Sequence, residues 1–162
     1  CGREDQSKLE KRSDVLVYRT PVLQEPFEIA GPIEVVLFVS TDAPDTDFTA
    51  KLVDVHPDGV VLNLRDGIKR LKYREFPRRP MNEPAEVEPG KVYEISIDLG
   101  NMAHRFEKGH RVGLHISSSN FPKYDRNLNT GENPYSSVKM QKAAQQVYRG
   151  KAHPSRLVLT VP

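Results

Sequence analysis

Alternation of apolar and polar residues with a period of two runs through most of this 162-residue chain. In KVYEISIDL (91–99), Tyr93, Ile95, Ile97 and Leu99 share one face, which indicates a strand with that face buried. Other segments alternate in the same way or run apolar with many β-branched residues: 14–20, 32–40, 48–56, 60–64, 67–75, 111–119 and 156–161. The pattern therefore predicts a chain built mainly of strands.

Short turn signals separate these segments: Ala30-Gly31-Pro32, Pro57-Asp58-Gly59, Asp66-Gly67, Pro89-Gly90 and Lys108-Gly109. Since Pro presets the first angle of a turn and Gly accepts a positive φ, residues 57–59 predict a hairpin. Many short strands and 13 prolines predict an all-β protein, an antiparallel β-sandwich or jelly roll. The crossover helices that an α/β fold needs are not visible in the pattern.

One segment carries a helical period. Met140, Ala143, Ala144 and Val147 recur at helical spacing and predict a helix over residues 136–148. The end of this segment, QQVYRG, is equally compatible with an extended conformation. Both interpretations stay open at this point.

Length and charge restrict the class of protein. The length is typical of one domain, and 24 basic against 22 acidic residues give a formal charge of +2. Because no window concentrates the basic residues, we expect no nucleic-acid partner, and we interpret the mixed charges of residues 65–79 as a solvated strand face. No apolar run approaches the ~18 residues of a membrane span and no secretory leader is visible, so we expect a soluble chain without a membrane partner and favour a cytoplasmic location.

The chemistry of a nucleophilic enzyme is missing from the sequence. No G-x-S-x-G elbow occurs, although an α/β-hydrolase needs one to expose its serine. Cys1, the single cysteine, lies at a chain terminus and has no positioned base, so we interpret its thiol as inert. We therefore expect this chain to contain no catalytic residue and no cofactor.

Two groups of residues raise the question of a metal site. Asp42, Asp45 and Asp47 crowd one loop, but they lack the glycine and glutamate spacing of an EF-hand, so we interpret them as carboxylates bonded to nearby backbone amides. No zinc spacing links the histidines, which we interpret as surface or turn residues: His56, His104, His110, His115 and His153. We expect no metal site, while a metal at the aspartates stays an alternative.

An independent carbohydrate-binding sandwich is a second alternative, because sugars stack on exposed aromatic rings. The chain has no Trp, and Phe38, Phe48 and Tyr93 lie within strand patterns. The sequence therefore offers few aromatic residues for a sugar site.

The stretch SSSNFPKYDRNLNTG (117–131) follows an alternating strand and is rich in side chains that bond to the backbone. Pro122 cannot donate to a ladder, so we expect the strand to leave the sheet there. We expect Arg126 to grip a carboxylate bidentately. The predicted structural loop comprises Ser119, Asn120, Phe121, Pro122, Tyr124, Asp125, Arg126 and Asn127.

Four stretches together resemble a known family: DVLVYRTPVL (14–23), residues 40–75, FEKGHRVGLHISSSNFPKYDRNLNTG (106–131) and HPSRLVLTVP (153–162). They are similar to the C-terminal domain of the X-Pro dipeptidyl-peptidase and cocaine esterase (CocE/NonD) family of α/β serine hydrolases. The likeness covers nearly the whole chain in the right order. Its most specific parts are TDFTAKLVDV, DGI and SSSNFPKYDRN.

The resemblance implies that residues 14–162 form one jelly-roll sandwich, akin to galactose-binding domains, and that residues 1–13 lead in from an α/β-hydrolase domain. It implies that the catalytic triad belongs to that other domain, since none of the triad maps onto this chain. The chain would then catalyse nothing alone, while its parent would be an acyl esterase or an X-Pro dipeptidyl-peptidase. The expected partner is the α/β-hydrolase domain, and the isolated chain is expected to expose a docking patch and to form homo-oligomers.

Overall fold

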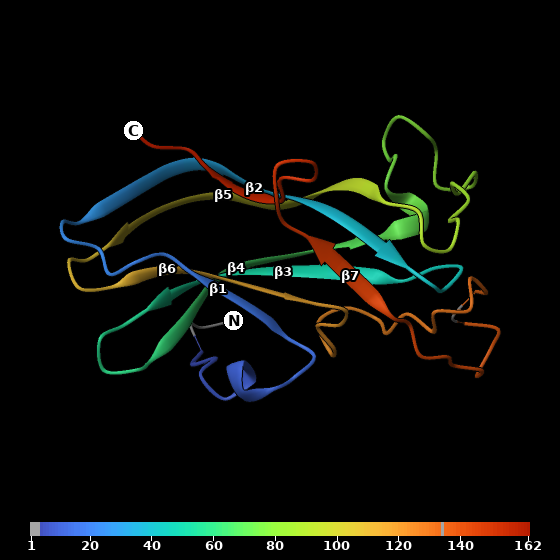
Figure 1. The fold of residues 1–162 in the computed structure, drawn as a ribbon, viewed down its shortest axis with the longest axis horizontal. Coiled ribbons are helices and arrows are strands. Elements are labelled where there is room, and N and C mark those ends of the chain that lie inside the picture. The colour runs from blue at the N-terminus through green and yellow to red at the C-terminus, as the bar shows by residue number, and fades with distance from the viewer. Residues whose placement is uncertain (1–3, 134) are drawn as a thin grey trace.

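Two antiparallel sheets packed face to face make up the computed structural model, which describes residues 4–133 and 135–162 (Figure 1). The first sheet has the order β1 (Leu16–Arg19), β6 (Arg111–Ser117), β3 (Asp47–Val55) and β4 (Val61–Arg70). The second has β5 (Tyr93–Phe106), β2 (Phe27–Thr41) and β7 (Gln145–Tyr148) in that order, and β8 (Arg156–Leu159) also pairs with β2. The antiparallel β-sandwich is confirmed, and the jelly-roll description stays a prediction.

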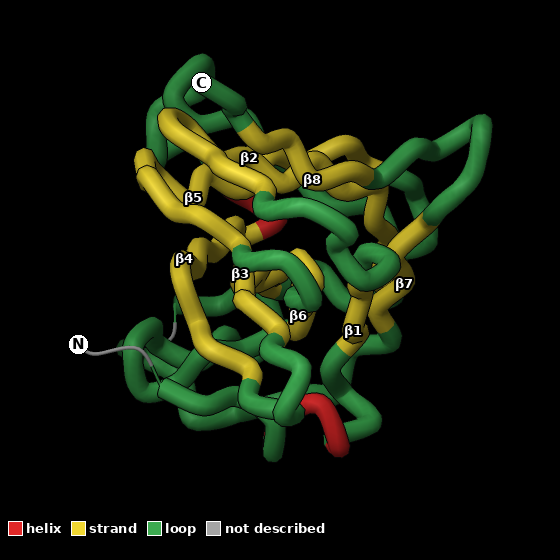
Figure 2. The backbone as a smooth tube through the Cα atoms, turned by 90° about the vertical axis from the view of Figure 1, so that its left-hand side faces the viewer, coloured by secondary structure: helices red, strands yellow, loops and turns green. Residues whose placement is uncertain are grey.

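The core lies between the two layers, which Figure 2 shows edge-on. The predicted buried face of residues 91–99 is confirmed, because Tyr93, Ile95, Ile97 and Leu99 are all buried. They meet alternating residues of the opposite sheet, such as Phe48, Leu52, Leu114 and Ile116. The period of two therefore marks the faces of these strands correctly.

Two predicted turns lie inside strands. The segments 60–64 and 67–75 do not form two strands, because Gly67 pairs with Ala50 within a continuous β4 and the chain then enters a 3-10 turn, η2 (Leu71–Tyr73). Gly31 likewise lies within β2, paired with Met102, and has a φ of 136°. The turns at residues 57–59, 89–90 and 108–109 are confirmed.

The helix predicted over residues 136–148 is wrong. Gln145–Tyr148 is strand β7, paired with Phe38–Thr41 of β2, and Val138 and Met140 point into solvent. Pairing with β2 satisfies backbone groups of an edge that a helix would leave open, so the extended alternative prevails. The described helices are the two 3-10 turns, η2 and η1 (Leu9–Lys11), and neither is long and apolar enough to cross a membrane.

Long and short connections lie at opposite ends of the sandwich. The loops 74–92 and 118–144 extend from one end, on the right of Figure 1, and the short turns 56–60 and 107–110 lie at the other. The first described residues pack on β4, since Gln6 N donates to Val61 O at 2.7 Å. We call the end with the two long loops the loop end, and the other the turn end.

Candidate functional site

The loop end begins where β6 leaves its sheet. Ser117, the last residue of β6, bonds through Oγ to Thr49 Oγ1 of the neighbouring β3 at 2.6 Å and donates to Ser119 O at 3.2 Å. Ser118 follows outside any strand, ahead of Pro122. The chain thus leaves the sheet after Ser117, earlier than at Pro122, where the sequence predicts the exit.

A carboxylate of β4 fastens the first turn of this loop. Asn120 Nδ2 donates to Asp66 Oδ2 at 3.0 Å, and the Lys123 ammonium pairs with the same carboxylate. Tyr124 N donates to Asn120 O at 3.2 Å and closes the turn. Polar side chains therefore hold residues 120–124 against the sheet.

The outer side of the loop presents Phe121, Pro122, Asp125 and Arg126 to solvent. The Arg126 guanidinium lies 5.5 Å from the centroid of the Phe121 ring, and it forms no ion pair with a carboxylate of the described residues, so the predicted bidentate grip is wrong. Asp125 accepts a hydrogen bond from the Tyr135 hydroxyl at 2.8 Å. This hydrogen bond joins the first half of loop 118–144 to its second half.

Asn127 links the loop to two buried carboxylates. Its Nδ2 lies 3.0 Å from Asp45 Oδ2 and 2.7 Å from Asp47 Oδ1, and both aspartates are 1% exposed. Arg70 donates from Nε and Nη2 to the two oxygens of Asp47 at 2.9 and 3.2 Å, and Lys72 N donates to Asp45 Oδ1 at 3.1 Å. Burial raises the pKa of Asp45 above its ordinary value of 3.8.

These contacts revise two predictions. Residues 65–79 are a solvated strand face only in part: Arg65 and residues 75–79 are exposed, but β4 ends at Arg70, and Arg70 and Lys72 turn towards the buried carboxylates. Asp42 and Asp45 accept hydrogen bonds from backbone amides, as predicted, the former from Ala144 N at 2.7 Å. The bidentate arginine grip that the sequence assigned to Arg126 is made by Arg70 on Asp47.

A groove of about 470 Å³ lies beside the loop and is lined by Lys51, His115, Phe121 and Arg126, among others. His115 is buried, which corrects its interpretation as a surface residue, and its Nε2 lies 2.9 Å from Glu10 Oε1. Its Nδ1 has no hydrogen-bond partner among the described residues. Burial lowers the pKa of His115 below 6.5, although Glu10 acts in the opposite direction.

The lowered pKa of His115 predicts a pH effect on stability. The folded state binds this proton less readily than the unfolded state, so the contribution of His115 is complete above about pH 6.5 and is lost as the pH falls through the folded pKa. We expect Glu10→Gln to steepen this loss, because it removes the carboxylate that favours the protonated ring, and His115→Gln to reduce it. Urea unfolding at several pH values measures both, and an identical slope in all three proteins would contradict the assignment.

Exposed apolar side chains gather on the two long loops. Loop 74–92 carries Phe76 and Met81, and Phe121 stands on loop 118–144 with three others, Tyr135, Val138 and Met140. Tyr135 and Val138 are 85% and 95% exposed. The sequence does not predict these exposed residues: Met140 belongs to the buried stripe of the predicted helix, and Tyr135 and Val138 carry no motif.

A second cluster lies at the turn end, around the buried carboxylate of Asp54. His110 Nδ1 lies 2.8 Å from Asp54 Oδ1, and His104 Nε2 lies 3.1 Å from Oδ2. His56 Nε2 lies 3.8 Å from the same Oδ2. The structure places His56 and His110 in turns, as predicted, and His104 in β5. The sequence did not show that the three histidines converge on Asp54, because zinc spacings count neighbours in sequence whereas these residues come from separate segments.

Comparison with known proteins agrees with this architecture. Residues 3–158 match the model of the X-Pro dipeptidyl-peptidase C-terminal non-catalytic domain. A cocaine esterase of Rhodococcus sp. (strain MB1 Bresler) is 46% identical over 162 residues, which are 99% of this chain and 28% of that protein.

Two solved structures share the fold. An aminopeptidase from the marine sediment archaeon Thaumarchaeota archaeon matches 97% of this chain with a TM-score of 0.86 and 34% identity. An alpha-amino acid ester hydrolase labelled with selenomethionine matches 99% of this chain with a TM-score of 0.87 and 34% identity. This chain spans 27% of each of those two chains. By the match over residues 3–158, this chain belongs to the family of X-Pro dipeptidyl-peptidase C-terminal non-catalytic domains.

Proposed function

We propose that this chain serves a serine hydrolase, an acyl esterase or an X-Pro dipeptidyl-peptidase, by docking on its α/β-hydrolase domain and helping to form the walls of its substrate pocket. In this proposal residues 1–13 lead in from the hydrolase domain and residues 14–162 form the docked sandwich. The names of the relatives, an esterase, an ester hydrolase and an aminopeptidase, support a hydrolase parent. The relatives are also several times longer than this chain, which leaves room for a catalytic domain.

The observation that carries the proposal is the set of exposed apolar side chains at the loop end. Phe76, Phe121, Tyr135, Val138 and Met140 project from loops held to the sheets by buried polar contacts, such as those of Asn127. A docking surface within one chain typically buries about 600–1,500 Å². Apolar groups on anchored loops favour such docking, because little conformational entropy is lost when they are covered.

Turnover tests the assignment of the chemistry. We expect the full-length protein to hydrolyse a p-nitrophenyl ester and the 162-residue chain to show no turnover, since the sequence lacks a nucleophile elbow. Turnover by the chain alone, unchanged after repeated purification, would contradict the proposal.

The docking surface itself predicts self-association of the isolated chain. We expect the sedimentation coefficient to rise with concentration, and the double variant Val138→Ser/Met140→Ser to weaken association about tenfold, because two apolar contacts are lost. The control is Val161→Ser, which removes a 56% exposed valine that lies on neither long loop and should change nothing. A strict monomer at every concentration would count against an exposed docking surface.

A carbohydrate-binding module is the second candidate, and the exposed rings of Phe121 and Tyr135 are the observation that favours it. Three results together would favour this function over docking. The isolated chain would bind a sugar saturably, Tyr135→Ala would abolish that binding, and the same substitution would leave hydrolysis by the full-length protein unchanged. The wide separation of apolar side chains over two loops fits a protein surface better than a single sugar ring.

A further inference from the structure

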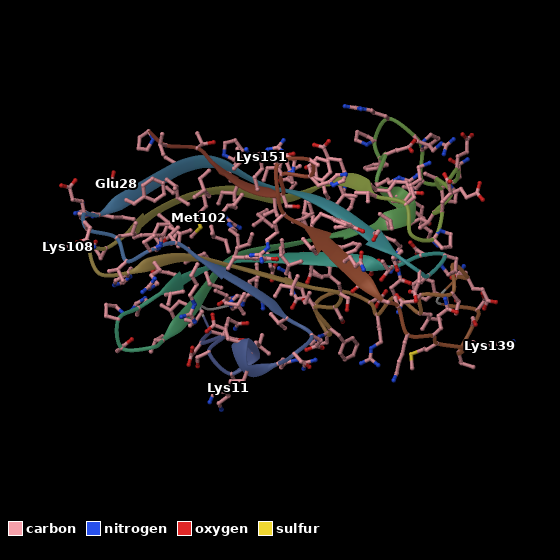
Figure 3. The ribbon with its side chains drawn as sticks, in the orientation of Figure 1. Lys11, Glu28, Met102, Lys108, Lys139 and Lys151 are labelled. Carbon is pink, nitrogen blue, oxygen red and sulfur yellow. The ribbon has the colours of Figure 1, made fainter. Side chains whose placement is uncertain are left out.

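The turn end brings together four potential ligand residues from two strands and two turns. Asp54 lies near the end of β3 and His56 directly after it, while His104 lies near the end of β5 and His110 just before β6. The turns touch, since a Cβ on Gly109 would lie 3.5 Å from Pro57. Lys108, labelled in Figure 3, marks this end, and Lys139 marks the opposite loop end.

The geometry is compact. The candidate ligand atoms of Asp54, His56 and His110 all lie within 4.8 Å of one another. The ring centroids of His56 and His110 are 4.3 Å apart. The Asp54 side chain is 5% exposed, and that of His56 is 28% exposed. The cluster is therefore buried from solvent at Asp54 and accessible to solvent at His56.

We propose that Asp54, His56 and His110 bind one divalent transition-metal ion, with Zn²⁺ as the reference case. Imidazole nitrogens and a carboxylate oxygen are a common ligand set for Zn²⁺, and ligand atoms in a tetrahedral site lie ~3.3 Å apart because the bonds are about 2.0–2.1 Å long. His110 Nδ1 and Asp54 Oδ1, now 2.8 Å apart, would need to separate by about 0.5 Å, and His56 would need to approach by about 1.5 Å or less, a movement that rotation of its partly exposed ring can supply.

His104 acts as a positioning residue. Its Nε2 bonds to Asp54 Oδ2 at 3.1 Å, and its ring stands edge-on to Phe106 with centroids 4.6 Å apart. Hydrogen bonds of this kind orient a ligating carboxylate and commonly change metal affinity by about 10–100-fold. One carboxylate oxygen is thereby held by the protein, and the other faces His110.

The ion would act as a structural clip. Asp54 and His56 belong to the β3–β4 hairpin of one sheet, while His110 lies in the connection that leads from β5 of the other sheet to β6. Three protein ligands leave at least one position for water, as in metal sites that remain open to solvent. Since the unfolded chain lacks this arrangement, binding should raise the unfolding temperature.

The test starts from the 162-residue chain carrying Cys1→Ser, so that no thiol competes for the ion. We expect calorimetry with Zn²⁺ to give one ion per chain, Co²⁺ to produce visible absorption bands, and the unfolding temperature to rise with Zn²⁺. In proton NMR spectra, the ring resonances of His56 and His110 should shift on addition of Zn²⁺, while those of His115 and His153 should stay in place. This last readout needs no substitution at the buried Asp54.

The decisive variant is His56→Gln, because this ring is the most exposed ligand and its loss should leave the fold intact. We expect it to weaken Zn²⁺ binding at least tenfold. The matched control is His153→Gln, whose ring packs between Phe38 and Tyr148 away from the cluster and whose loss should leave the affinity unchanged. Absence of saturable binding, or binding that His56→Gln leaves unchanged, would overturn the proposal, and either result is independent of docking at the loop end.

Discussion

Replacing Arg70 by methionine is expected to lower the free energy of unfolding by about 3 kcal/mol. The guanidinium bonds both oxygens of Asp47 and lies 3.9 Å from Asp45 Oδ2, so its removal leaves the buried Asp47 without the cation that it pairs with and leaves Asp45 with Lys72, whose Nζ lies 3.8 Å from Oδ2. The value lies at the lower end of the usual range of about 3–5 kcal/mol for breaking a buried pair, because the Arg70 side chain is still 22% exposed. Urea unfolding monitored by circular dichroism measures the change.

The control is Arg105→Met, which removes an arginine that also contacts two carboxylates, those of Glu28 and Glu107. Those ion pairs are exposed, so we expect a loss below about 1 kcal/mol. The double variant Arg70→Met/Asp47→Asn should recover much of the stability, because it removes a buried charge together with its partner. Equal losses for Arg70→Met and Arg105→Met would show that the buried carboxylates do not depend on Arg70.

The same site predicts a pH dependence for the Arg70→Met variant. Burial raises the pKa of Asp45 above 3.8, so this group favours the folded state below that value and its contribution is lost as the pH rises through the folded pKa. Without Arg70, protonation of Asp45 removes one of two neighbouring buried negative charges, which then have Lys72 as their nearby cation. We therefore expect the defect to be smaller at about pH 4 than at about pH 8, and a constant defect would contradict this origin.

Replacing Gly67 by valine is expected to cost about 3 kcal/mol as well. A Cβ at Gly67 would lie 2.5 Å from Asp98 O and 2.9 Å from Leu99 Cδ2, atoms of the facing strand β5. A backbone oxygen cannot give way as the end of a flexible side chain does, so the two sheets must move apart. Thermal and urea unfolding measure the loss.

The control for this steric effect is Ala103→Val on β5, which adds volume at an exposed strand position and should leave stability within about 0.5 kcal/mol. Gly67→Ala should give a loss between the two. If valine at position 67 were tolerated as well as valine at position 103, the close approach of β4 and β5 would not be a constraint on the fold.

Much of the fold was predictable from local pattern. The face formed by Tyr93, Ile95, Ile97 and Leu99 is buried as expected, because successive side chains of a strand point to opposite sides whatever the strand pairs with. Positions with two local explanations were not predictable in this way. Asp66-Gly67 has the sequence of a turn, but Gly67 lies in a strand and allows close contact between the two sheets. Residues 136–148 have a helical period but form no helix.

The candidate site was predictable only in part. The loop 119–127 and its dense polar bonding follow from its sequence, whereas the carboxylates that hold it lie about 55–80 residues away. Arg126 was the expected carboxylate partner, but Arg70 has that role, since a sequence does not show which charged side chain lies opposite which. For the same reason, the sequence did not predict that His56, His104 and His110 surround Asp54.

By itself, the sequence determined what depends on neighbours along the chain: strand faces, hairpin turns, the absence of a nucleophile elbow and the resemblance to a non-catalytic domain. The tertiary structure alone decided which loops share an end and which histidines surround Asp54. The physical reason is the separation along the sequence of the residues that interact. Alternation and turn geometry arise from the backbone of a few residues, whereas buried charges and converging histidines arise where segments distant in sequence pack together.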